Sequence, residues 1–195
     1  MQVDSGKWTG KDMIAVGVYT AIYFVLIAGC AFMGLVPILM VAYAFLAPII
    51  GAVPMMIYYT KIKKFGMLSV TGIVTGALVC VTGMGIYPFL FSIVSSLLAE
   101  FILKAGKYRS VKAIIASYSV FSFWLLGNYI PLFIDPASYF ATRKDYGQAY
   151  EDALRSYLPM WMLPVMAVGI IIFAAIGAWI AKGINKKHFE KAGLV

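Results

Sequence analysis

The sequence predicts an all-α, polytopic membrane protein: a bundle of six transmembrane helices with both termini in the cytoplasm. Of its 195 residues, 63% are hydrophobic and only 12% are charged, and the mean hydropathy is +0.90. Because soluble domains carry roughly 25% charged residues, this chain has too little polar surface to cover a water-soluble globule. The composition therefore argues against a soluble enzyme, a nucleic-acid-binding module and a disordered chain.

Stretches without charged residues locate the individual spans. Four of them, residues 13–60, 65–99, 113–134 and 156–181, contain 48, 35, 22 and 26 residues. A membrane-crossing helix needs about 20 apolar residues, so these stretches hold two, two, one and one spans. Glycine and proline at 34–37 and 83–88 predict turns that divide the first two stretches. The predicted spans are 13–33, 37–58, 67–83, 87–103, 111–133 and 158–181, in a single integral membrane domain covering residues 1–195.

The basic residues predict the orientation of the bundle. The chain has sixteen Lys and Arg against eight Asp and Glu, a net charge of +8. Six spans place thirteen of the basic residues on one side of the membrane and only Arg143, Lys144 and Arg155 on the other. Basic residues are concentrated in cytoplasmic loops. Both termini are therefore expected in the cytoplasm and residues 134–157 outside.

The external segment 134–157 is long for a simple connection and is polar and partly acidic. Segments of this length often form lids or contain a short helix, which we expect over residues 149–157. The alternative is a solvated surface loop.

Several kinds of reaction chemistry are missing. Residues 29–34 have the glycine spacing of a phosphate-binding loop, but Leu35 and Val36 replace the Lys and Ser/Thr that hold phosphate and magnesium. The single histidine, His188, lies in the C-terminal tail, and Cys30 and Cys80 are isolated. We therefore expect no catalytic residue, no metal and no cofactor, and a protein that is not an enzyme.

Glu100 is the one acidic residue predicted within a span. Intramembrane acids often belong to proton or ion relays. Glu100 also lies four residues before Lys104, near the cytoplasmic end of the fourth span, where it can reach the interface beside that lysine. The interfacial interpretation is favoured, and a functional role is the alternative.

Small residues recur at spacings that allow helices to pack closely. Gly17, Ala21 and Ala28 share one face of the first span, and Gly72 and Gly76 form a GxxxG pattern in the third. In lipid, close backbone approach contributes strongly to helix association. The patterns predict either packing within the bundle or docking onto another membrane subunit.

Aromatic residues gather toward the predicted outer ends of the spans. Trp124 and Asn128 are one turn apart on the fifth span, so a planar ligand can stack on Trp124 while the Asn128 amide contacts its polar edge. Tryptophan and tyrosine are also common at membrane interfaces, which is the alternative explanation. The predicted ligand-binding residues are Trp124, Asn128, Tyr129, Tyr87, Trp161 and Tyr139.

These features together resemble the S components of energy-coupling factor (ECF) transporters. The six spans, the basic cytoplasmic side, the small-residue first span and the missing ATPase motif carry the resemblance. Residues 98–112 (LAEFILKAGKYRSVK) look like the fourth span and following loop of the Trep-Strep group of these proteins. Residues 118–131 and the polar external segment are also similar.

The resemblance implies a substrate-binding subunit of a vitamin or micronutrient importer in the bacterial plasma membrane. Such a subunit binds its substrate at the outer side and associates with a transmembrane T component and two cytoplasmic ATPases. In the family, an AxxxA pattern in the first span docks onto the T component. The nearest match here is Gly17 to Ala21, with Gly in place of the first Ala, and Ala28 lies two turns further on as a third expected docking residue. From the residues we expect a planar substrate with little charge. Two alternatives remain: a self-sufficient facilitator or channel, and a membrane-embedded enzyme or assembly factor.

Overall fold

A computed structural model describes residues 7–193, and the described residues form helices and turns without any strand. Six helical segments are long and apolar enough to cross a membrane. Their bounds are Gly10–Leu35, Pro37–Tyr59, Met67–Met84, Tyr87–Ala105, Val111–Asn128 and Met162–Ile184. All six spans predicted from the charge-free stretches are therefore found. Most of their ends differ from the predicted ends by a few residues.

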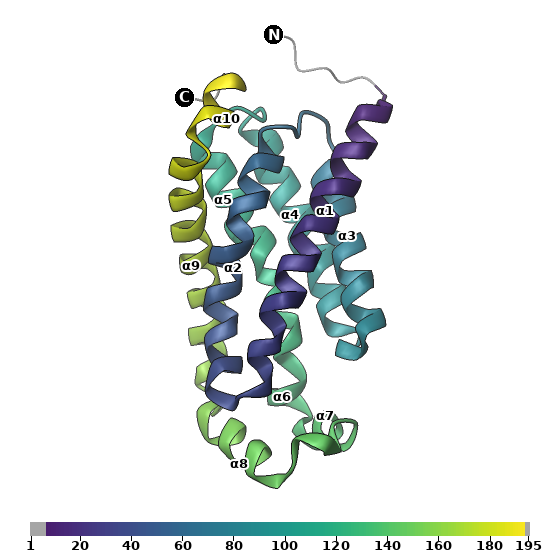
Figure 1. Cartoon of the computed structure of the whole chain (residues 1–195), viewed down its shortest axis with the longest axis vertical. Coiled ribbons are helices and arrows are strands. Elements are labelled where there is room, and N and C mark those ends of the chain that lie inside the picture. Colours follow the sequence, from purple (N-terminus) through teal and green to yellow (C-terminus); the bar gives the residue numbers. More distant parts are fainter. Residues whose placement is uncertain (1–6, 194–195) are drawn as a thin grey trace.

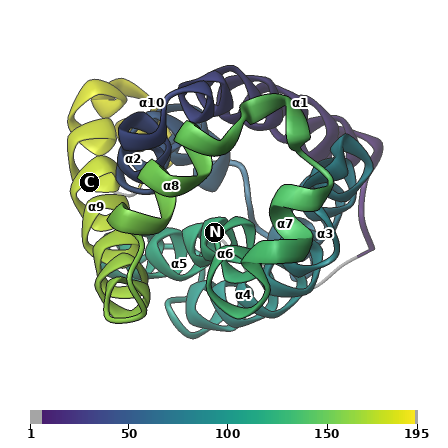
Figure 2. The same cartoon turned by 90° about the horizontal axis from the view of Figure 1, so that it is seen from below.

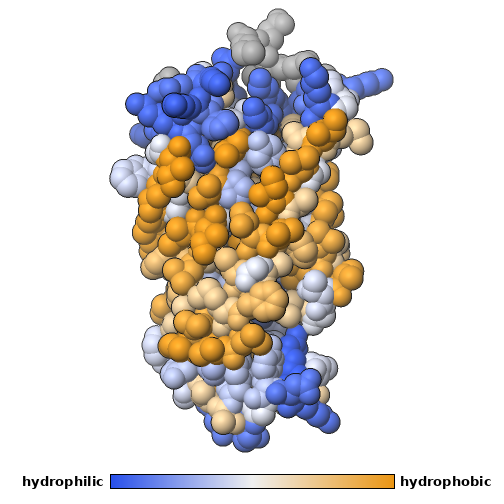
Figure 3. Space-filling model, viewed as in Figure 1, coloured by the Kyte–Doolittle hydropathy of each residue, from blue (hydrophilic) through white to orange (hydrophobic). Residues whose placement is uncertain are grey.

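The spans pack side by side in a bundle (Figure 1). The helix α9 (Met162–Ile184) packs along α2 (Pro37–Tyr59), and α4 (Tyr87–Ala105) packs along α3 (Met67–Val79). On the face shown in Figure 3, a broad band of apolar residues crosses the middle of the bundle, and hydrophilic residues lie toward both ends. This distribution is what a bundle crossing a bilayer requires.

The start of α1 (Gly10–Ala31) and the C-terminal helix α10 (Lys186–Lys191) lie at the same end of the bundle (Figure 1). We call this end the termini end, and the opposite end, which carries residues 134–157, the loop end. The location of the termini end in the cytoplasm remains a prediction from the basic residues.

The loop end is covered by a folded cap rather than by a solvated loop. The cap contains α7 (Pro136–Ala141), a 3₁₀ turn η4 (Lys144–Tyr146) and α8 (Gln148–Tyr157), which lie across the ends of the spans (Figure 2). The helix expected over 149–157 corresponds to α8. Tyr150 anchors it by donating its hydroxyl hydrogen bond to the Gly34 carbonyl, and Leu154 is buried beneath it.

The fifth span is not the single α-helix expected over 111–133. The α-helix α5 covers only Val111–Phe121, the 3₁₀ segment η3 covers Ser122–Asn128, and a short α6 covers Ile130–Ile134. The Ser122 hydroxyl donates to the Tyr118 carbonyl, which competes with regular helical bonding. Gly127 also packs directly on the backbone of Pro88, where a Cβ would lie only 2.7 Å from the proline Cα. The tighter helix thus brings the end of the fifth span against α4.

The GxxxG pattern of the third span serves packing within the bundle. A Cβ on Gly72 or on Gly76 would collide with the side chain of Ser96 or of Ser92 on α4. The absence of side chains at the two glycines therefore allows α3 and α4 to approach closely, as small residues do in membrane helix pairs.

Glu100 does not reach the interface beside Lys104, and that prediction is wrong. Its side chain is 0% exposed, and its Oε2 accepts hydrogen bonds from the backbone amides of Leu68 (2.8 Å) and Ser69 (3.0 Å). These amides belong to the first turn of α3, whose N-cap residue Gly66 has no side chain to cap them. Glu100 thus caps the N-terminus of α3 from the neighbouring helix α4, where a negative charge is favourable.

Candidate functional site

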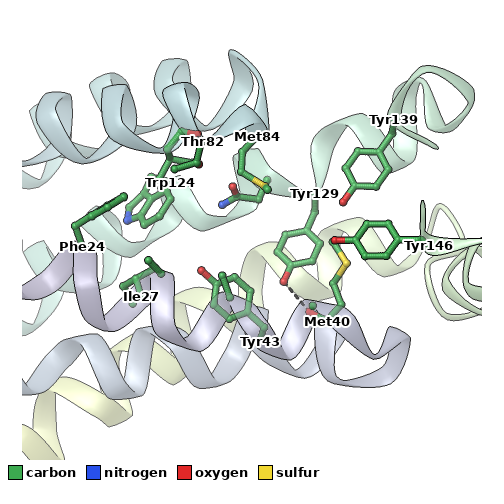
Figure 4. Close-up of a pocket in the computed structure, with 15 residues that line it drawn as sticks. Phe24, Ile27, Met40, Tyr43, Thr82, Met84, Trp124, Tyr129, Tyr139 and Tyr146 are labelled. Atoms are coloured by element: carbon green, nitrogen blue, oxygen red, sulfur yellow. Dashed lines mark hydrogen bonds between the residues drawn. The ribbon is translucent and has the colours of Figure 1, made fainter. Parts of the chain in front are cut away.

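A cavity of about 240 Å³ lies near the loop end of the bundle (Figure 4), and we call it the central cavity. It lies between α1, α2, η2 (a π-helical turn, Cys80–Met84) and η3, with side chains of the cap at one end. This volume is below the ~300–1,000 Å³ typical of pockets for drug-sized ligands, so the cavity suits a small compound. It is lined by Phe24, Ile27, Ala28, Ala31, Gly34, Met40, Tyr43, Val79, Thr82, Met84, Trp124, Asn128, Tyr129, Tyr139 and Tyr146.

Trp124 forms a fixed aromatic wall of the central cavity. Its side chain is 1% exposed, and its indole Nε1 donates a hydrogen bond of 3.0 Å to the Tyr23 hydroxyl. The Tyr23 and Trp124 rings also meet edge to face, with centroids 6.5 Å apart. Because the indole N–H is already engaged within the protein, Trp124 offers a ligand its apolar ring surface.

Two polar groups of the lining retain hydrogen-bonding capacity. Asn128 donates from Nδ2 to the Leu125 carbonyl at 3.1 Å, and within residues 7–193 its Oδ1 makes no hydrogen bond. The Tyr43 hydroxyl on α2 likewise has no partner in the described part of the chain. Tyr129, by contrast, donates to the Met40 carbonyl at 2.7 Å and is already satisfied (Figure 4). Asn128 and Tyr43 therefore supply an acceptor and a hydroxyl for the polar edge of a ligand.

Tyr139 of the cap lines the central cavity at the loop end. The Arg143 guanidinium lies over the Tyr139 ring at 4.1 Å from the centroid and donates to the Gly83 carbonyl at 3.0 Å. Arg143 thus links the cap to the loop end of the third span. Burial raises the pKa of the Tyr139 phenol, so this hydroxyl stays protonated and uncharged at neutral pH.

The lining combines aromatic surface with neutral polar groups, and none of its fifteen residues is charged. Such a cavity can bind a flat, uncharged compound by stacking and by a few hydrogen bonds. The lining holds no acid, histidine or cysteine that a reaction at the site would use as nucleophile or base. Across residues 7–193, no three His, Cys, Asp or Glu side chains gather as a metal site would require.

Four of the six predicted ligand-binding residues line this cavity, namely Trp124, Asn128, Tyr129 and Tyr139. Tyr87 and Trp161 do not. Tyr87 is the first residue of α4, and Trp161, which precedes α9, is 66% exposed. Exposed tryptophan near a helix end is typical of the membrane interface.

The lining residues of the first two spans were not anticipated from the sequence. Phe24 and Ile27 come from α1, and Tyr43 comes from α2 (Figure 4). One signal for Tyr43 was available, because a tyrosine almost two turns into an apolar span must place its hydroxyl away from lipid.

The predicted docking residues lie on the surface of α1. A Cβ on Gly17 would meet no atom within 4 Å, and Ala21 is exposed. Ala28 is exposed as well, but it also lines the central cavity. Gly17 and Ala21 therefore leave part of the α1 surface without bulky side chains.

Comparisons with known proteins identify the family of the chain. Residues 10–191 match the model of a family described as a hypothetical bacterial integral membrane protein (Trep_Strep). No curated protein and no solved structure matches the chain. The match covers all six spans and the cap, so this integral membrane protein belongs to the Trep_Strep family.

Proposed function

We propose that the protein is the substrate-binding subunit of an ATP-driven ECF-type importer of a vitamin or related micronutrient. The observation that carries the proposal is the central cavity, which is aromatic, uncharged and located at the expected outer end of the bundle. A site of this kind binds a solute without performing chemistry on it. The sequence contains no phosphate-binding loop with its Lys and Ser/Thr, so the energy for import would come from partner subunits.

The proposed substrate is a small planar compound with little charge. Its ring would stack on Trp124, and its polar edge would contact Asn128 Oδ1 and the Tyr43 hydroxyl. The volume of about 240 Å³ favours a compound of one or two rings.

The proposed partners are a transmembrane T component and two cytoplasmic ATPases. The uncovered surface at Gly17 and Ala21 supports docking through α1, because small residues let a partner helix approach the backbone closely. The experiment that tests this assembly is co-purification of tagged protein from its native membrane in a gentle detergent. Recovery of a T component and ATPases is expected. Their consistent absence, together with solute uptake by this chain alone in ATP-depleted vesicles, would favour a self-sufficient facilitator instead.

Replacement of Ala21 by leucine is expected to reduce transport strongly while leaving ligand affinity nearly unchanged. The larger side chain would separate α1 from its partner, but Ala21 does not line the central cavity. The measurement compares ATP-dependent uptake and equilibrium binding for the same variant. Ala77→Leu is the matched control, since Ala77 is also exposed but lies on α3. Normal uptake by Ala21→Leu, or an equal loss in both variants, would contradict docking through this face.

Replacement of Asn128 by alanine is expected to weaken ligand binding by about 3- to 10-fold, the value of one hydrogen bond of about 0.5–1.5 kcal/mol. Tyr43→Phe removes only a hydroxyl from the same cavity and should produce an effect of similar size. Isothermal titration with the substrate measures both. Unchanged affinity in both variants would show that these two groups do not contact the ligand.

A further inference from the structure

The three basic residues at the loop end are an exception to the charge distribution of the chain, and they converge on one site. Arg143, Lys144 and Arg155 all line a second cavity of about 400 Å³ between α7 and α8, which we call the outer cavity. These are all the basic residues among positions 113–181. Basic residues are less common in the outer loops of membrane proteins than in the cytoplasmic loops. Because the three basic residues of the outer segment all line one cavity, we infer that positive charge has a local use there.

The outer cavity has an excess of positive charge. Glu151 is the single acid in its lining, and its Oε1 pairs with Arg155 at 2.7 Å. Arg143 donates to neutral acceptors, namely the carbonyls of Tyr139 and Gly83 and the Thr142 hydroxyl. No carboxylate of the described chain pairs with Arg143 or Lys144. Three cations against one anion leave the lining with a charge of +2.

Two of the three cationic groups lie against aromatic rings, whereas Lys144 is exposed. The Arg143 guanidinium stacks on the Tyr139 ring at 4.1 Å, and the Arg155 guanidinium lies 5.5 Å from the centroid of the Phe140 ring. Phe140 is buried and lines the outer cavity. Gly147, also in the lining, is the N-cap of the ten-residue helix α8 and has no side chain to cap the first amides. Fixed guanidinium groups beside open amides favour the binding of an oxyanion.

We propose that the outer cavity binds a small soluble anion through its phosphate or carboxylate group. The volume of the outer cavity leaves space for a solute larger than the oxyanion itself. Arg143 links this site to the central cavity, because it lines the first and stacks on Tyr139, which lines the second. The proposal is independent of the function proposed for the central cavity, since it concerns other residues and is tested by anion binding alone.

The test is isothermal titration calorimetry, in which inorganic phosphate is added to the purified full-length protein at constant ionic strength. Saturable binding is expected for the unchanged protein. Lys144→Gln should weaken it by at least about fivefold, since a hydrogen bond to a charged group is lost. Lys191→Gln is the matched control: it removes the same charge from an exposed position at the termini end and should leave binding unchanged. The absence of saturable binding, or an equal loss in both variants, would overturn the proposal.

A second arm separates a soluble anion from a lipid headgroup. The titration is repeated in nanodiscs of phosphatidylcholine alone and of phosphatidylcholine with phosphatidylglycerol. Equal phosphate affinity in the two kinds of nanodisc is expected for a site that takes soluble anions. Loss of phosphate binding only with phosphatidylglycerol would overturn the assignment to a soluble anion and assign the site to the lipid headgroup.

Discussion

Replacing Glu100 by alanine is expected to lower the stability of the bundle severely, by about 3 kcal/mol or more. The change removes the acceptor of two buried backbone amides, those of Leu68 and Ser69, at the start of α3. Each buried amide left without a partner costs about 1–3 kcal/mol. The measurement is the midpoint of thermal unfolding in detergent, followed by circular dichroism.

Glu100→Gln is the matched control for this substitution. Glutamine keeps the shape of the side chain and one acceptor oxygen, so it should retain much of the capping and lose a smaller part of the stability. If Glu100→Ala unfolds at the same temperature as the unchanged protein, the carboxylate does not hold α3 in place. If both variants are stable but fail in transport, Glu100 has a functional role instead.

Replacing Trp124 by alanine is expected to weaken ligand binding by about 30-fold or more. This factor corresponds to the loss of about 2 kcal/mol of binding free energy from a buried aromatic contact. The indole is the largest aromatic side chain in the lining of the central cavity and is fixed by its hydrogen bond to Tyr23. Alanine removes the stacking surface and also enlarges the cavity. Isothermal titration with the substrate measures the loss.

Two further variants separate binding from folding at this position. Trp124→Phe keeps an aromatic face in the cavity and should bind better than Trp124→Ala. Trp161→Ala removes a tryptophan that is 66% exposed and lies outside the lining of the central cavity. The affinity of this variant for the ligand should therefore be unchanged. Full affinity in Trp124→Ala, with the fold intact, would exclude the central cavity as the ligand site.

The transmembrane architecture could be predicted because the bilayer imposes a simple constraint. Every charged side chain placed in the hydrocarbon region is costly, so charge-free stretches of sufficient length mark the spans directly. The same reasoning found the turns at 34–37 and 83–88, where glycine and proline interrupt the apolar sequence. The helix α8 could be expected from the length and polarity of the segment that contains it.

The features that were missed depend on contacts between spans. Glu100 could not be recognised as a cap, because nothing in its own helix shows that the uncapped start of α3 lies beside it. The 3₁₀ segment η3 brings Gly127 against Pro88, and these residues are 39 positions apart in the sequence. Trp124 and Asn128 were found because they share one span, whereas Tyr43 reaches the same cavity from another helix.

The central claim is that the cavity beside Trp124 captures a small planar compound, and native mass spectrometry of the gently purified protein tests it most directly. Ala31→Phe is the comparison variant, because Ala31 lies in the lining and a phenyl group there would fill the space without removing a core residue. The account predicts a bound compound of low mass on the unchanged protein and its loss from Ala31→Phe. A protein that carries no small compound even from native membranes, or one that carries it equally with the cavity filled, would contradict the account.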